Sequence, residues 1–365
     1  MKDTIRESLL EEVDSYADHT PPAGMDLIDS SLGVNPYGFP PLVRQVLHDF
    51  DADRLSTYSQ NTIAQDAVVQ YWQDLAHIEL ENVFPTDGSI SALTMLLTVL
   101  SRPGNNMVCF APAFTNVLEF AHIIGIEVDT VAACAAERHR ENVDALLGHI
   151  NDDTALVYID NPNNPTGQFL SQADLKKILD VCEERGIYAI IDEAYADFIP
   201  RQESAVLLGP CYHCMISVRT LSKGFGLAGI RAGYIITNRE LIDFLKKIGH
   251  PFMMNEIGRE LMKAVLTGKD LPDAHADDFS IIKAALRDAC GARLSMAITD
   301  DRVPICLLAH ADSNADLQAL LMEQGLLTVS GREFASLDAN SARLCVSKLE
   351  DAARLIHAVR IVAEA

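Results

Sequence analysis

The feature that most constrains the fold is an alternation, from about residue 85 onward, between short apolar runs and amphipathic helical stretches. Apolar runs of this length separated by helices are typical of parallel strands that are covered on both faces. We therefore expect an α/β fold in which helices sandwich a mainly parallel sheet. The predicted strands are 107–111, 155–160, 188–192, 215–218 and 233–237.

One helix can be placed closely between two of these strands, over 172–185. Leu175, Ile178, Leu179 and Cys182 recur there at helical spacing and would form its buried face. Ser171 is a suitable N-cap and Gly186 a suitable residue to end the helix.

The pattern changes beyond residue 249, where longer helices and a few strands follow, such as 303–308 and 342–346. This change predicts a large domain over 41–250 and a smaller α+β domain over 251–365. We expect the N-terminal segment 1–40 to join the smaller domain. The chain has 365 residues, which is a common size for such a pair.

The charge of the chain narrows the classes of partner. The formal net charge is −23 at pH 7, and an acidic surface repels nucleic acid and anionic lipid.

The first residues lack the apolar core of a signal peptide, and no apolar stretch approaches the ~20 residues that span a bilayer. We expect a cytoplasmic protein with reduced, mostly buried cysteines and no bound metal, since Cys211 and Cys214 lack a second pair.

Three loops that follow predicted strands carry chemically useful side chains. They are 160–167, 192–195 and 219–231. Ligands of open α/β sheets bind just outside the carboxyl ends of the strands, so we expect these loops to converge there.

Together the loops offer what pyridoxal phosphate requires. That cofactor needs a lysine amine for a Schiff base, an anion beside its ring nitrogen, donors for its ring oxygen, an aromatic side chain to stack on its ring and a phosphate cradle. Lys223 could supply the amine and Asp192 the anion, because a carboxylate at the end of a buried strand is costly unless it is paired.

The motifs resemble those of the fold-type-I, class I/II aminotransferases that depend on pyridoxal phosphate, and most of all the histidinol-phosphate aminotransferase branch. The resemblance rests on Asn-Pro-Thr-Gly at 164–167, Asp-x-x-Tyr at 192–195 and Ser-Lys at 222–223, in this order. Matching stretches run from Asn35 to Arg343. The resemblance implies a ping-pong transfer of an amino group between an L-amino acid, or an amino-alcohol phosphate such as histidinol phosphate, and a 2-oxo acid.

The resemblance also implies a role for each residue of the catalytic centre. Lys223 is similar to the lysine that forms the Schiff base and then moves a proton between the substrate Cα and the cofactor. Asp192 is similar to the partner of the ring nitrogen. Tyr195 and Asn164 resemble the residues that hydrogen-bond the ring oxygen, and Phe114 resembles the aromatic residue that stacks on the ring.

Several residues would form the phosphate cradle. The start of a helix at Gly88, Ser89 and Ile90 presents backbone N–H groups to an anion, and Arg231 adds a charge-assisted hydrogen bond. Thr220 and Ser222 resemble the hydroxyl contacts of the family. Tyr58 resembles a tyrosine that reaches the phosphate from the neighbouring subunit, which implies a homodimer with shared active sites.

The substrate would be held by a further set of residues. Arg343 resembles the arginine that binds the α-carboxylate through two hydrogen bonds, and Asn35 and Asn164 also fall at substrate-binding positions. Two features depart from the histidinol-phosphate branch: Ile90 stands where acidic residues are usual, and Val329 stands where an arginine binds the substrate phosphate. Arg332 could replace that arginine, so the distal group of the substrate stays open.

Other activities fit parts of the sequence. A decarboxylase or a lyase/cyclase of the same fold, similar to threonine-phosphate decarboxylase, would carry nearly the same motifs. A nicotinamide oxidoreductase is suggested by Gly-x-Gly-x-x-Gly at 224–229, but that motif must open a helix and here it runs into a predicted strand. A cofactor-binding regulator of DNA would need a basic segment, and the sequence has none.

Overall fold

The computed structural model describes residues 26–59, 61–102, 104–250, 252–268 and 272–365. The part of the predicted N-terminal segment before residue 26 lies outside the described residues.

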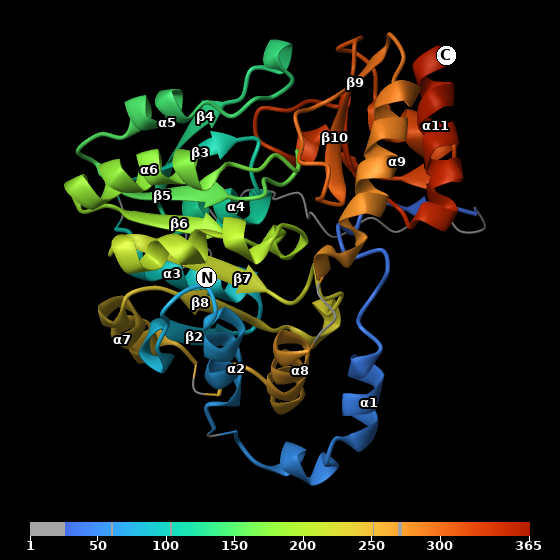
Figure 1. Cartoon of the computed structure of the whole chain (residues 1–365). Coiled ribbons are helices and arrows are strands. Elements are labelled where there is room, and N and C mark those ends of the chain that lie inside the picture. The colour runs from blue at the N-terminus through green and yellow to red at the C-terminus, as the bar shows by residue number, and fades with distance from the viewer. Residues whose placement is uncertain (1–25, 60, 103, 251, 269–271) are drawn as a thin grey trace, which may run out of the picture.

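A seven-stranded sheet forms the centre of the described chain (Figure 1). Its order is β2-β8-β7-β6-β5-β3-β4, and within it β8 alone runs antiparallel to its neighbours. This confirms the mainly parallel sheet, while β2 and the edge strand β4 were not predicted. The strands are β2 (Val83–Thr86), β3 (Asn106–Ala111), β4 (Glu127–Ala132), β5 (Thr154–Asp160), β6 (Tyr188–Asp192), β7 (Met215–Thr220) and β8 (Gly233–Ile236).

Helices cover both faces of this sheet. Successive residues of β3 point to opposite faces, so Cys109 packs with α3 (Ser89–Leu100), α4 (Thr115–Ile123) and α7 (Arg239–Ile248). Its neighbour Phe110 packs with α5 (Val143–His149) and α6 (Gln172–Arg185) on the other face. Burial on both faces explains why these strands read as continuous apolar runs.

The helix predicted over 172–185 is confirmed as α6, and so are its ends. The Ser171 side chain accepts a hydrogen bond from the amide of Asp174. Gly186 follows the helix with φ +67, a left-handed conformation that glycine adopts without strain.

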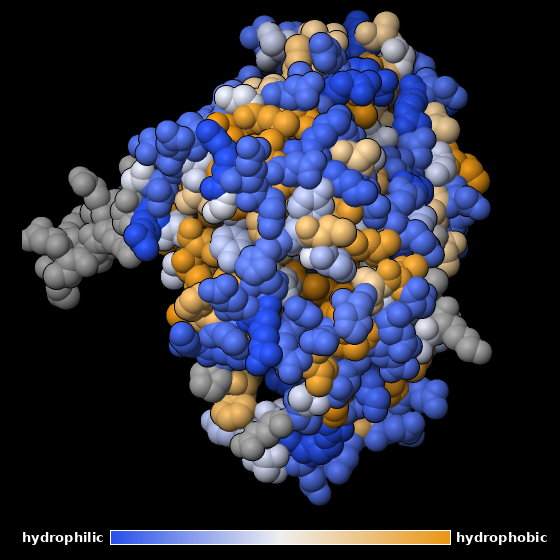
Figure 2. All heavy atoms as spheres, turned by 60° about the vertical axis from the view of Figure 1, so that its left-hand side comes forward, coloured by the Kyte–Doolittle hydropathy of each residue, from blue (hydrophilic) through white to orange (hydrophobic). Residues whose placement is uncertain are grey.

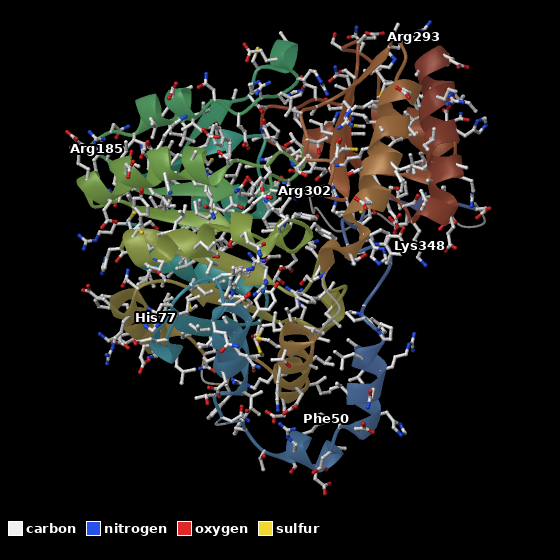
Figure 3. The ribbon with its side chains drawn as sticks, viewed as in Figure 1. Phe50, His77, Arg185, Arg293, Arg302 and Lys348 are labelled. Atoms are coloured by element: carbon white, nitrogen blue, oxygen red, sulfur yellow. The ribbon has the colours of Figure 1, made fainter. Side chains whose placement is uncertain are left out.

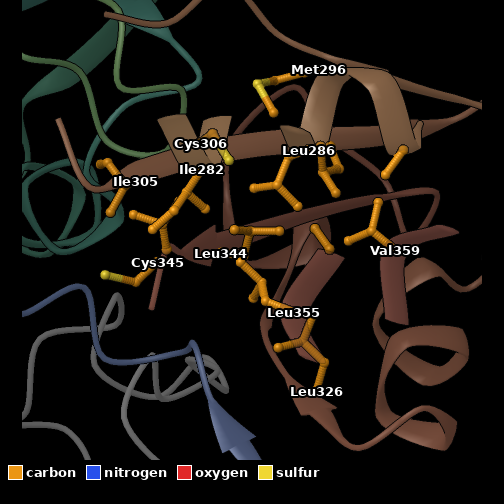
Figure 4. Packing of buried hydrophobic residues seen from close by; sticks show 14 of the residues in the cluster. Ile282, Leu286, Met296, Ile305, Cys306, Leu326, Leu344, Cys345, Leu355 and Val359 are labelled. Carbon is orange, nitrogen blue, oxygen red and sulfur yellow. The ribbon is translucent and has the colours of Figure 1, made fainter. Parts of the chain in front are cut away.

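The C-terminal part of the chain forms a second core. A four-stranded antiparallel sheet of order β12-β13-β10-β9 packs against helices α9 and α11, and Figure 4 shows Ile282 and Leu286 of α9 meeting Ile305 and Leu344 of the sheet. The predicted strands 303–308 and 342–346 exist, displaced by one or two residues. The elements are α9 (Ala276–Ala289), β9 (Leu294–Met296), β10 (Ile305–His310), α10 (Leu317–Glu323), β12 (Val329–Ser330), β13 (Ser341–Cys345) and α11 (Ala352–Glu364).

The N-terminal strand β1 (Ile28–Asp29) pairs in parallel with β11 (Leu326–Leu327) and so lies beside this second core. In contrast, α8 (Glu256–Thr267) packs with α1 (Leu42–Asp49) and α2 (Ile63–Trp72), on the side of the large sheet. The domain boundary at 250 remains a proposal, and the packing of α8 favours a boundary after Thr267.

The face of the molecule in Figure 2 is mostly hydrophilic, with apolar side chains scattered over it. No helix in the described part of the chain is both long and apolar enough to cross a membrane. All eight cysteines are free thiols in the structure, and Cys134 and Cys211 are the two that are exposed.

Candidate active site

The three loops meet at one edge of the large sheet. Strands β5, β6 and β7 are parallel neighbours, so their carboxyl ends lie side by side. In register, Asp192 at the end of β6 lies opposite Asp160 at the end of β5 and Val218 of β7. The loops that carry Asn164, Tyr195 and Lys223 start from these ends.

Asp192 is a buried carboxylate whose hydrogen-bond donors are both neutral. It accepts bonds from the Tyr158 hydroxyl at 3.1 Å and from the Ala194 amide at 3.1 Å. Burial is the main cause that raises the pKa of Asp192 to about 6, and those two bonds only partly oppose it. A cationic ligand atom beside this carboxylate would therefore be strongly favoured.

Lys223 lies close to Asp192 and Tyr195. Its Nζ is 5.5 Å from the centroid of the Tyr195 ring. Burial, and then the charge of Arg343, lower the pKa of Lys223 to about 8. A lowered pKa leaves a larger fraction of the amine neutral at pH 7, which is the form that attacks a carbonyl.

The N-terminal segment completes this part of the site. The Tyr195 hydroxyl donates to the carbonyl of Gly33 at 2.9 Å. A Cβ on Gly33 would collide with that hydroxyl and would lie 2.7 Å from Nη1 of Arg343, which is 1% exposed on β13. Tyr195, which follows β6, and Arg343, on β13, therefore approach the same glycine.

Asp160 organises the next loop and was given no role by the sequence reasoning. Its Oδ2 accepts from the backbone amides of Phe114 at 3.1 Å and Asn164 at 2.9 Å, and its Oδ1 accepts from Nδ2 of Asn163 at 3.0 Å. One buried carboxylate thus fixes the backbone of both Phe114 and Asn164. The available signal was an acidic residue that ends a buried strand.

The predicted phosphate cradle is brought together around Gly88, the N-cap of α3 with φ +86. A Cβ at Gly88 would lie 2.6 Å from Nη2 of Arg231. Nη1 of Arg231 donates to Oγ of Ser222 at 3.3 Å, and the Ser222 and Thr220 hydroxyls are 2.9 Å apart. Ser89 begins α3. Ile90 is 44% exposed and apolar, so only its backbone N–H can contribute to the predicted cradle.

Asn35 is placed differently from a simple substrate contact. Its Nδ2 donates to the carbonyl of Gly224 at 2.8 Å, directly after Lys223. Asn35 therefore holds the loop that carries Lys223, and its contact with a substrate stays a prediction.

Two predicted residues lie apart from this group. Tyr58 is 76% exposed and stacks on Phe252 with ring centroids 4.5 Å apart. Arg332 lies at the surface with its Nη1 3.5 Å from Asp316. The neighbouring turn does approach the site, because Thr115, which follows Phe114, donates to the carbonyl of Glu333.

A buried ion cluster beneath the site was also missed. Arg219 lies between Glu193, at 3.1 Å, and Asp197, at 2.5 Å, with its guanidinium over the Trp72 ring. These residues stand near Asp192, Tyr195 and Lys223 in the sequence, so the cluster links the loop after β6 to the loop after β7. The available signal was the charged residues that directly follow two predicted strands, Glu193 after 188–192 and Arg219 after 215–218.

The Gly-x-Gly-x-x-Gly segment at 224–229 leads only into a single 3-10 turn (Ala228–Ile230) and then into β8, so it opens no α-helix. That arrangement is inconsistent with a dinucleotide-binding turn.

The comparison with protein families decides the identity of this arrangement. The model of the family "Aminotransferase class I and II" matches residues 26–359. The chain belongs to the class I and II aminotransferases. The predicted family and the predicted class of enzyme are thereby confirmed.

Individual members of the family show the range of similarity. The chain is 31% identical to histidinol-phosphate aminotransferase 2 of Oceanobacillus iheyensis over 246 residues, which is 67% of this chain and 66% of that relative. The histidinol-phosphate aminotransferase of Clostridium acetobutylicum has a TM-score of 0.82 at 19% identity, covering 93% of this chain and 99% of that one. That of Sinorhizobium meliloti, in complex with pyridoxal 5′-phosphate, has a TM-score of 0.79 at 19% identity, covering 93% and 91%. These structural likenesses confirm the fold-type-I α/β fold.

Proposed function

We propose that this aminotransferase uses pyridoxal 5′-phosphate and moves an amino group between an L-amino acid and a 2-oxo acid by a ping-pong mechanism. The observation that carries the proposal is the meeting of Lys223 and Asp192 at the sheet edge. One is an amine whose pKa burial lowers to about 8, and the other is a carboxylate whose pKa burial raises to about 6.

The residues present fit this cofactor. Because position 88 has no Cβ, the Arg231 guanidinium can approach the start of α3, and the hydroxyls of Ser222 and Thr220 follow next to it. The bound cofactor supplies an electron-withdrawing ring that stabilises negative charge on the Cα of the substrate. The start of α3, Arg231 and the two hydroxyls would hold the phosphate of the cofactor, and Asp192 would hold its ring nitrogen.

The side chains of this chain would then perform distinct tasks. Asp192 would keep the ring nitrogen protonated, because a buried carboxylate gains most from a paired cation. Lys223 would take the proton from Cα of the substrate and deliver it to the cofactor. Its lowered pKa favours the neutral amine that accepts the proton. Tyr195 and Asn164 would hydrogen-bond the ring oxygen, Phe114 would stack on the ring, and Arg343 would bind the α-carboxylate.

The distal group of the substrate is less constrained. Val329 lies opposite Arg343 in the register of β12 and β13 and is 1% exposed. Arg332 lies at the surface beside Asp316. Histidinol phosphate is a candidate because relatives carry that name, but its phosphate would need Arg332 to leave Asp316. An amino acid without a distal phosphate suits the described side chains better.

We further propose a homodimer in which Tyr58 reaches the cofactor phosphate of the partner subunit. The exposure of Tyr58, 76%, and of Phe252, on which its ring stacks, 41%, supports this, since adjoining exposed apolar side chains favour contact with another surface. Light scattering of the enzyme and of a Tyr58→Ala variant would test it. A monomeric wild-type enzyme would contradict the proposal.

The first test is the absorbance of the bound cofactor during titration with a panel of amino donors that includes histidinol phosphate. We expect one donor to change the spectrum, a 2-oxo acid to restore it, and Lys223→Ala to show neither change. Release of carbon dioxide or ammonia without a new amino acid would instead indicate the decarboxylase or lyase. A Lys223→Ala variant with near-normal turnover would overturn the proposal.

A further inference from the structure

A lysine is buried in the apolar face of α9. Phe279, Ile282, Lys283 and Leu286 follow one another at helical spacing, and each is 0% exposed. A buried ammonium is costly unless its donors are satisfied, so its position calls for a reason. Its helix neighbours Ile282 and Leu286 belong to the second core, where Figure 4 shows them.

The ammonium of Lys283 is bound to one short segment. Nζ donates to Oγ1 of Thr299 at 2.7 Å and to the carbonyl of Asp300 at 2.8 Å. Burial lowers the pKa of Lys283 to about 8, so the amine is still mostly protonated at pH 7. The charged and titratable groups around it are Asp300 and Asp301 on that segment, Cys306 on β10 and Arg287 on α9 itself.

The same segment touches the loop that carries Asn164. The amide of Asp300 donates to the carbonyl of Gly167 at 2.8 Å. Gly167 has φ +73, and a Cβ there would lie 2.6 Å from Oγ1 of Thr299, the atom that Lys283 binds. The amide of Gly167 in turn donates to the carbonyl of Asn163 at 2.8 Å.

A second tether holds this segment from the other side. Arg302 bridges Asp300, at 2.7 Å, and Glu203 of the 3-10 turn Arg201–Glu203, at 2.6 Å. Figure 3 shows Arg302 where the C-terminal part meets the large sheet. That ion pair is partly exposed, whereas Lys283 is buried, so Lys283 is the stronger constraint.

We propose that Lys283 is a positioning residue that acts from the second core through Thr299 and Asp300 on Gly167, and so fixes the loop that carries Asn164. For catalysis this inference rests on the proposed function, since Asn164 is the residue assigned to the cofactor ring oxygen. The physical link itself does not depend on that function.

The link is tested first by hydrogen exchange of the apo protein. Lys283→Met keeps the length of the side chain and removes its donors, and Thr299→Val removes the hydroxyl while keeping the shape. We expect both variants to exchange the amides of 163, 164, 166 and 167 roughly tenfold faster or more, with β3 unchanged. Thr299→Ser, which keeps the hydroxyl, should exchange like the wild type. Lys263→Met, at an exposed lysine of α8, is the matched control.

Global stability separates positioning from simple support. Lys283→Met removes the cost of burying a charge but also removes the donor to the Asp300 carbonyl. These two effects oppose each other, so the variant should unfold at nearly the same urea concentration as the wild type. A lower midpoint with uniformly faster exchange would show a merely structural lysine and overturn the proposal. Unchanged exchange at 163–167 would overturn it as well.

Cofactor affinity and the steady-state kinetic constants test the catalytic consequence. We expect Lys283→Met to weaken binding of pyridoxal phosphate to the apo protein roughly tenfold, and to raise KM for the amino donor more than it lowers kcat. Faster loop exchange with unchanged cofactor affinity would overturn the link to Asn164. If the wild-type chain bound no pyridoxal phosphate, the proposed function would fail, while the exchange experiment would still decide the link.

Discussion

Two adjacent buried carboxylates, Asp192 and Glu193, have opposite kinds of partner. Asp192 accepts two hydrogen bonds, both from neutral donors, and burial raises the pKa of Asp192 to about 6. Glu193 lies 3.1 Å from Nη1 of Arg219 and also accepts bonds from two serine hydroxyls and an amide, namely Ser204 Oγ at 2.8 Å, Ser217 Oγ at 2.7 Å and Ala205 N at 2.9 Å.

The difference supports the proposed assignment of Asp192 to a ligand and of Glu193 to the fold. Neighbouring residues at a strand end point to opposite sides of the sheet. Asp192 therefore faces the candidate site, and Glu193 faces Arg219. Glu193 and Asp197 share Arg219, and they brace the loops from below. Asp192 and Lys223 face the site with shifted pKa values, as is common for functional groups.

The largest effect that sharpens this comparison is expected for Arg219→Met. Removing the cation leaves two buried carboxylates without their partner, which should cost about 3–5 kcal/mol of unfolding free energy. Urea unfolding of the apo protein measures this cost. Lys177→Met, which breaks the exposed pair with Asp174, is the control and should change stability by less than about 0.5 kcal/mol. Equal losses in the two variants would remove the structural role of the cluster.

A smaller loss is expected for Glu193→Gln. Asp197 still pairs with Arg219, and the amide can still accept from a serine, so we expect about 1–3 kcal/mol of lost stability. The folded fraction should keep nearly wild-type kcat because Glu193 faces away from the site. Turnover by the folded fraction as low as in Asp192→Asn would erase the distinction between the two carboxylates.

The smallest effect on stability concerns the phosphate cradle. Gly88→Ala puts a Cβ beside Arg231 at a positive φ, so we expect the apo protein to lose about 1 kcal/mol and the cofactor to bind roughly tenfold more weakly. Gly148→Ala, in α5 with open space around it, should leave cofactor binding unchanged and stabilise slightly. Unaltered cofactor affinity in Gly88→Ala would place the phosphate elsewhere.

Much of the central sheet could be predicted from the sequence because its strands are buried on both faces and so read as apolar runs. The edge strand β4 was not predicted because its outward residues, such as Glu127 and Asp129, are polar. The short strand β2 escaped because Pro85 interrupts its apolar pattern. The register between β5 and β6, which sets Asp160 opposite Asp192, follows from tertiary packing that no local pattern encodes.

Residues of the candidate site could be predicted where the chemistry requires a particular side chain, as an amine requires Lys223 and an anion requires Asp192. The supporting residues could not, because their partners are distant in the sequence. Asp160 holds a loop by accepting backbone amides, and Lys283 acts through Thr299 on Gly167. Neither pattern differs locally from an ordinary strand end or an amphipathic helix.

The most direct test of this account compares the unfolding free energies of the wild type and Asp192→Asn between pH 4 and pH 8, with and without pyridoxal phosphate. The pKa of Asp192 is higher in the folded protein than its ordinary value of 3.8, so its ionisation destabilises the fold, with only a small penalty near pH 4 and the full penalty above pH 7. We predict that apo Asp192→Asn is about 1–3 kcal/mol more stable than the wild type at pH 7 and nearly equally stable at pH 4.

The cofactor should reverse that order at pH 7, and kcat/KM of the variant should fall on the order of 10²–10³-fold. An apo variant less stable than the wild type at pH 7, stabilised by the cofactor as much as the wild type is, would contradict the account and make Asp192 a structural residue like Glu193.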